Sequence, residues 1–252
     1  MREHSLHDTM QTHFNIRMAE LNTAIPCVVT NVVGELANQR IDVQPAINLL
    51  YKDGTSEERP QILGVPVMFP GSNTSLISWP INVGDTVMCV FSQRSMDNFK
   101  IGNGQPTVPN DYRKMAAQDA VAFPGLQPFA KSLNNPAIRL FPHSTRDLVI
   151  SHNVGTASEV EIRFKENGDM IVNTKFNVNV NAKTATVTAL EKITLAAPLM
   201  EVNVTQTNWT GNITHTGNYT QTGTSTFNGI VFDTHKHLGV TPGSGTSGVA
   251  TS

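Results

Sequence analysis

The 252-residue sequence lacks the features that mark several common protein classes. Its first residues, MREHSLHDTMQTHF, contain no apolar core, so we expect no secretory signal peptide there. No uninterrupted apolar run approaches the ~18 residues that span a bilayer. The net charge is −2, and the sequence contains no cluster of Lys and Arg. This argues against nucleic acid as a partner, because phosphate binding relies on concentrated positive charge. We therefore expect a protein that is assembled in the cytoplasm and binds no nucleic acid.

Cysteine is scarce, and the two copies present have no metal-ligand spacing. Cys27 and Cys89 both lie in apolar runs of strand-like composition. Because proteins assembled in a reducing compartment keep their thiols reduced, we expect two buried free cysteines rather than a disulfide or a metal site.

Aspartate, proline and charge become rare in the second half of the chain. Between residues 171 and 230 the sequence has 14 Thr and 9 Asn but only five charged side chains, one proline and no aspartate. The first half instead carries ordinary amounts of Leu, Pro, Met and charge. This shift in composition indicates that two different architectures are joined in one chain.

The N-terminal part predicts a short helix followed by a small β-barrel. Residues 5–24 carry apolar side chains at helical spacing, so the N-terminal arm, residues 1–24, is expected to form an amphipathic helix that docks on another surface. Beyond it, short apolar runs alternate with turn residues at intervals of about ten residues. Five runs best fit an oligonucleotide/oligosaccharide-binding (OB) fold over residues 25–104, although the spacing alone also allows another small barrel. The runs cover residues 25–33, 40–51, 61–69, 75–81 and 84–92.

Residues 105–150 are predicted to form a connector. Five of the fourteen prolines lie between Pro106 and Pro136, and each proline fixes φ and removes a backbone donor. We therefore expect an irregular, stiff segment that contains one short helix at residues 114–121.

Alternating patterns return after residue 150 and predict strands over residues 151–231. Val160, Ile162 and Phe164 share one face of a strand, and a tight turn is expected at residues 166–169. Further along, the apolar faces are one residue wide. A single chain of this kind buries too little apolar area to offset the ordering of its backbone, and it leaves its strand edges open. Three copies wound about a common axis remove both difficulties, so we predict an all-β protein whose second part is an intertwined trimeric β-helix or β-prism needle.

Two histidines, His235 and His237, stand two positions apart in the final segment, residues 232–252. Residues so spaced in a strand point to the same side, so a threefold axis would gather six imidazoles, two from each chain. Six nitrogen ligands suit a first-row transition metal, with iron as the leading candidate, because Mg²⁺ and Ca²⁺ prefer oxygen and Zn²⁺ prefers four ligands. The alternative is a pair of solvent-exposed polar side chains. His215 is expected to be an exposed strand residue, with an inward-facing ion ligand as its alternative.

Two stretches resemble the central spike, or membrane-piercing needle, at the baseplate of contractile-tailed bacteriophages. Residues 79–99 (WPINVGDTVMCVFSQRSMDNF) and 119–126 (DAVAFPGL) are similar to the N-terminal OB domain of these spikes. The sequence THKHLGVTPGSGTSG resembles their apex, where three chains hold one iron ion through His-x-His. The matching positions in the OB domain are Gly84 and Asp85 at a turn, followed by Arg94, Ser95 and Asp97 in a polar loop.

The resemblance implies a structural protein of the virion and no catalytic activity. The OB domains would attach a homotrimer to the baseplate hub at the tail tube, and sheath contraction would drive the spike through the host outer membrane. The implied cofactor is one iron ion per trimer, held by His235 and His237 of each chain. Two alternatives remain open. One is a trimeric tail fibre or adhesin with a His-x-His metal ring, and the other is a metal-dependent hydrolase, which needs further ligands and an open coordination position.

Overall fold

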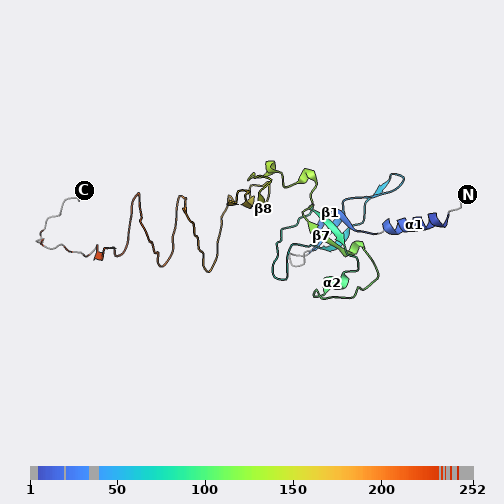
Figure 1. Ribbon diagram of the computed structural model, residues 1–252, viewed down its shortest axis with the longest axis horizontal. Helices are drawn as coiled ribbons and strands as arrows, with labels where there is room; N and C mark the ends of the chain where they lie inside the picture. The colour runs from blue at the N-terminus through green and yellow to red at the C-terminus, as the bar shows by residue number, and fades with distance from the viewer. Residues whose placement is uncertain are drawn as a thin grey trace. The chain divides into compact units, whose positions relative to one another are not determined.

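The computed structural model describes residues 5–19, 21–33 and 40–232, together with residues 234, 236, 239 and 243. The chain divides into two compact units, Met1–Asn181 and Ala182–Ser252. Strands outnumber helices throughout (Figure 1), which confirms the all-β class. Among the described residues, none of the helices combines the length and the apolarity that a membrane crossing requires.

Helix α1 (Leu6–Ala19) opens the first unit, as the spacing of its apolar residues predicts. A capping box starts it: the Asp8 amide donates to Ser5 Oγ at 3.2 Å, and the Ser5 amide donates to Asp8 Oδ2 at 3.3 Å. The apolar stripe of the helix is largely uncovered by the described residues of its own chain. Its members, each 51–77% exposed, are Leu6, Met10, Phe14 and Met18, and Leu21, just beyond the helix, is 40% exposed.

A five-stranded antiparallel barrel follows. Its strands are β1 (Ala24–Val33), β2 (Arg40–Pro45), β5 (Ile62–Pro66), β6 (Thr86–Phe91) and β7 (Ala120–Pro124). They are ordered β5-β2-β1-β6-β7. The sheet closes because Val67, directly after β5, bridges Ala122 of β7 in parallel, and the Met68 amide donates to the Ala122 carbonyl at 2.9 Å. This curled antiparallel sheet is an OB-like barrel, as predicted.

Alternation along the barrel strands sends one face of each strand into a common core. Cys27 and Cys89 are both free and fully buried there, which confirms the prediction made for them. Small and β-branched side chains dominate the core because they pack well on a tightly curved sheet. Its members are Cys27, Val29, Ile41, Val43, Ile62, Val65, Val67, Val87, Cys89, Phe91, Ala120 and Ala122.

Two predictions for this unit are wrong. Residues 75–81 form no strand, and residues 114–121 form no helix. Instead, a 3₁₀ turn (η1, Ala117–Asp119) leads directly into β7. Ala120 and Ala122 are fully buried against the barrel core, and this tertiary burial overrides the helical propensity of alanine.

Short elements join the longer ones. They are the hairpin strands β3 (Leu49–Leu50) and β4 (Ser56–Glu57), helix α2 (Asp97–Ile101), and the 3₁₀ turns η2 (Phe129–Lys131) and η3 (Pro136–Ile138). Strand β7 and all three 3₁₀ turns fall within residues 105–150, the predicted connector. The first part of that segment therefore supplies the last strand of the barrel, and the remainder is irregular, as its prolines predict.

A second antiparallel sheet completes the first unit, in the order β10-β9-β8. Its strands are β8 (Leu148–His152), β9 (Val160–Phe164) and β10 (Met170–Asn173). The predicted turn joins β9 to β10, with Gly168 at a φ of 91°. A positive φ is a conformation that glycine adopts without steric cost, which explains its place in the turn.

The chain beyond β10 is extended. The described residues 174–225 contain no strand, and they appear in Figure 1 as a plain trace. A short hairpin, β11 (Thr226–Phe227) and β12 (Ile230–Val231), follows. The trimeric β-helix predicted for this part is not formed by a single chain and stays a prediction.

Candidate functional site

The segment of residues 174–224 pairs with no strand among the described residues and leaves its large apolar side chains mostly exposed. Its backbone makes no hydrogen bond to the backbone of any described residue. Unpaired strand edges and exposed apolar side chains both oppose the ordering of an isolated chain. The arrangement therefore fits a segment that other chains complete. Its large apolar side chains, 53–103% exposed, are Phe176, Val178, Val180, Val187, Leu190, Ile193, Leu195, Leu199, Met200, Val202, Val204, Trp209, Ile213 and Tyr219.

A six-residue repeat runs through the end of this segment. Gly211, Gly217, Gly223 and Gly229 each follow a Thr or an Asn. All four have positive φ, between 80° and 123°, a region that residues with a side chain rarely adopt. Each glycine thus marks a place where the extended chain turns. The prediction from composition missed this repeat, although comparing the sequence with itself at an offset of six residues would have found it.

His215 lies within this repeat and is exposed. Its Nε2 atom is 3.1 Å from the Asn218 carbonyl oxygen, and its ring packs edge to face against Tyr219 at a centroid distance of 6.0 Å. In the single chain His215 is therefore exposed and contacts its own repeat, and it lies in no strand. Its role in an assembly of chains stays a prediction.

His235 and His237 lie outside the described residues, so their role as ligands stays a prediction. The hairpin before them pairs Phe227 with Ile230, and the Phe227 and Phe232 rings meet edge to face at 6.2 Å. In the described part of the chain, no three His, Cys, Asp or Glu side chains are placed to hold a metal ion.

One arginine holds together the polar loop that follows β6. The Arg113 guanidinium contacts the carboxylates of Asp97, Asp111 and Asp119, each at 2.7 Å. Asp119 is fully buried and also accepts a hydrogen bond from the Met96 amide at 2.9 Å. The family resemblance predicted Asp97 in a polar loop, whereas the structure makes it the first residue of α2. No sequence pattern pointed to Arg113, because its partners are scattered along the chain and meet only in the fold.

The other matched positions lie where the resemblance places them. Gly84, at a φ of 93°, turns the chain just before β6, and Asp85 follows it. Arg94 and Ser95 lie in the loop between β6 and α2, where Ser95 Oγ donates to Asn110 Oδ1 at 2.6 Å. These residues shape turns of the barrel.

A buried carboxylate fixes the irregular segment onto the second sheet. Glu159 is fully buried, and its Oε2 atom accepts hydrogen bonds from the Leu140 amide at 3.0 Å and the Gly155 amide at 2.8 Å. Burial of Glu159 opposes its ionisation, but the backbone donors outweigh that effect and hold its pKa below the ordinary value. Glu159 is therefore an anion that ties two loops together.

The next inward residues of β9 form a second link to the same segment. Glu161 and Arg163 are both buried and form an ion pair. Arg163 donates to the Phe141 carbonyl at 2.9 Å, and Asn173 of β10 donates to Glu161 at 2.9 Å. The inward face of this sheet is thus charged, in contrast to the apolar core of the barrel.

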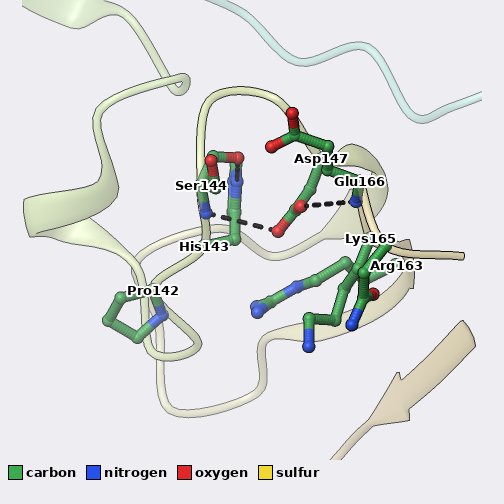
Figure 2. A pocket seen from close by; sticks show the side chains of 8 residues that line it. Pro142, His143, Ser144, Asp147, Arg163, Lys165 and Glu166 are labelled. Atoms are coloured by element: carbon green, nitrogen blue, oxygen red, sulfur yellow. Dashed lines mark hydrogen bonds between the residues drawn. The ribbon is translucent and has the colours of Figure 1, made fainter. Parts of the chain in front are cut away.

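An open pocket lies beside this sheet (Figure 2). Asp147 spans part of it, accepting the Ser144 amide at 3.3 Å and the Glu166 amide at 3.2 Å. Lys165 pairs with Asp169 at 3.1 Å. The charged groups around this pocket therefore hold turns and strands together. The lining residues are Pro142, His143, Ser144, Asp147, Arg163, Lys165, Glu166 and Asn167.

Acid is expected to destabilise the first unit. Burial opposes the ionisation of Asp119, as it does that of Glu159. The hydrogen bonds from Arg113 and the Met96 amide outweigh the effect of burial, so the pKa of Asp119, like that of Glu159, lies below its ordinary value. A carboxylate with a lowered folded-state pKa stabilises the fold above its unfolded pKa, and that stabilisation is lost as the pH falls through the folded value. We expect a nearly constant melting temperature between about pH 7 and 5, and a decline below about pH 4. An Asp119→Asn variant, melted over the same range, should show a smaller decline; an equal decline would mean that this carboxylate is not responsible.

Two family models match this chain, one over the barrel and one near the end of the given sequence. The phage protein Gp138 N-terminal domain matches residues 25–125, and the GpV Apex motif matches residues 229–251. The first match spans the whole barrel including β7, and the second includes His235 and His237. A search of curated proteins finds no match for this chain.

Proposed function

We propose that this chain is a phage baseplate central spike, on the basis of the family matches to its N-terminal domain and its apex. It works as a homotrimeric needle that is driven through the host outer membrane. Tail contraction supplies the work, and the protein supplies a stiff, narrow point. No step of this function requires catalysis by the chain.

The observation that carries the proposal is the unpartnered segment of residues 174–224. Three such segments wound together pair each backbone edge with a neighbour and turn the apolar side chains toward the common axis. Bending a needle of this kind requires breaking hydrogen bonds between chains, so it resists deformation. The Thr and Asn side chains remain on the outside, where water satisfies them.

The barrel is the proposed attachment to the tail. It is a closed domain with its own core, so it folds independently of the needle and holds the base of each chain. The partner is the hub at the end of the tail tube. The uncovered apolar stripe of α1 is consistent with additional contacts at this end.

The apex is proposed to close the needle with one metal ion. His235 and His237 contribute two imidazoles from each chain, and six neutral nitrogens fit a first-row transition metal such as iron. Since His235 and His237 are only two ligands per chain, six ligands require the association of three chains. With all coordination positions filled by protein, the ion would be structural.

Native mass and metal content test this proposal together. The purified protein is expected to have the mass of three chains and about one iron ion per three chains, by light scattering and elemental analysis of one sample. A His235→Ala/His237→Ala variant should keep the mass of three chains and lose the iron, because the needle and not the ion holds the chains together. His215→Ala is the matched control and should keep both. A wild-type protein with the mass of one chain would refute the proposal.

A further inference from the structure

The second sheet exposes an apolar face that nothing in its own described chain covers. Strand register aligns two rows of side chains across the three strands. One row is Ile150, Ile162 and Val172, and the other is Leu148, Phe164 and Met170. These six side chains are 37–64% exposed.

The inward face of this sheet mixes buried charged side chains with the half-buried Val149 and Ile171, whereas its outward face carries the two apolar rows. An antiparallel sheet with one solvent-exposed face normally turns its apolar side chains toward the core and its polar side chains toward water. Here Glu159, Glu161 and Arg163 face inward and are buried under the segment that contains Leu140 and Phe141. The chain therefore uses its own connector to cover the charged face and leaves the apolar face open.

The exposed face continues directly into the unpartnered segment. Met170 and Val172 of β10 have the same alternation in the sequence as Phe176, Val178 and Val180, and the backbone of the single chain bends between the two sets, at Lys175 and Phe176. A partner that straightens this bend would place all five on one side of the chain. They are 49–77% exposed. A partner that covers the stripe of the needle would therefore also cover the face of the sheet.

We propose that the outward face of β8, β9 and β10 is the first layer of the core shared by three copies of this chain. This inference rests on the proposed function, since the same two neighbouring copies are its occupants. Each copy contributes two rows of apolar side chains. Packing the rows of three copies together removes their apolar surface from water, which stabilises the assembly. The connector, fixed through Glu159 and Arg163, supports this layer from outside.

A charge placed on this face tests the inference. Ile150→Glu is expected to lower the melting temperature of the three-chain assembly by several degrees or to release single chains, because three carboxylates would meet in an apolar core. Ile47→Glu is the matched control, since Ile47 is 56% exposed and Ile150 is 63% exposed in the single chain. The control should retain the mass of three chains. A trimer of unchanged melting temperature for Ile150→Glu would overturn the inference and leave the proposed function standing.

Chemical labelling gives a second test that does not depend on the folding of a charged variant. Ile150→Cys in the assembled protein is expected to react with a maleimide on the order of tenfold more slowly than Ile47→Cys. The native cysteines are fully buried and free, so they add little background. Equal rates in a protein with the mass of three chains would show that the face is open in the assembly, as it would be if it served the hub or a lipid surface. A wild-type mass of one chain would instead refute the proposed function itself.

Discussion

Replacing Arg113 by methionine is expected to lower the free energy of unfolding of the barrel by about 3 kcal/mol. The substitution removes the partner of Asp119, which is fully buried, and leaves that carboxylate with only the Met96 amide. It also releases Asp97 and Asp111, which repel each other and Asp119 once the guanidinium is gone. The loop after β6 should lose its order at the same time.

Urea unfolding of the full chain measures this effect. In a Trp209→Phe background, the remaining Trp79 reports the barrel, because it packs edge to face on Phe69 at 5.1 Å. Arg146→Met is the matched control, since Arg146 pairs with Glu166 at the surface, where side-chain exposures are 75% and 60%. An exposed pair contributes about 0.2–1 kcal/mol at most. Equal losses for the two variants would contradict the role of Arg113.

Replacing Glu159 by alanine is expected to destabilise the second sheet by about 1–3 kcal/mol. The Leu140 and Gly155 amides would both lose their acceptor. Leu140 is half-buried, so its unpaired amide carries the cost, whereas Gly155 is exposed and its amide can bond to water. The segment before β8 should detach from the sheet more often as a result.

Hydrogen exchange of the assembled protein locates that effect. The amides of Leu140 and Gly155 should exchange faster in Glu159→Ala, while those of β1 should not change. Glu166→Ala removes a carboxylate at the surface and serves as the control, with little change expected at either site. If exchange rises equally in the barrel, the effect of Glu159 is global and the proposed link between connector and sheet is wrong.

Alternation and composition predicted much of this fold because each reports burial directly. The pattern at Val160, Ile162 and Phe164 correctly predicted β9, and the turn residues around Gly84 correctly predicted the start of β6. The shift toward Thr and Asn after residue 171 coincides with the end of β10 and the start of the extended segment, while the predicted trimeric needle stays a prediction. The family resemblance then added the order of the parts.

Tertiary contacts account for what the sequence did not predict. Alanines at 120 and 122 favour a helix locally, yet pairing with β6 draws them into the barrel. The charged side chains of Glu159 and Glu161 suggest a solvent-facing strand surface, yet the connector covers them. The glycines that recur every six residues carried a usable signal that composition alone does not reveal.

The shared alternation of β10 and the chain after it limits how such a protein changes length. Met170 and Phe176 stand six positions apart, an even offset that keeps their side chains in phase along an extended strand. Losing or gaining one residue near Thr174 would turn Phe176, Val178 and Val180 away from the side that carries Met170 and Val172, whereas losing or gaining two would preserve the phase. Changes of length at this junction over evolutionary time are therefore expected to come in pairs of residues.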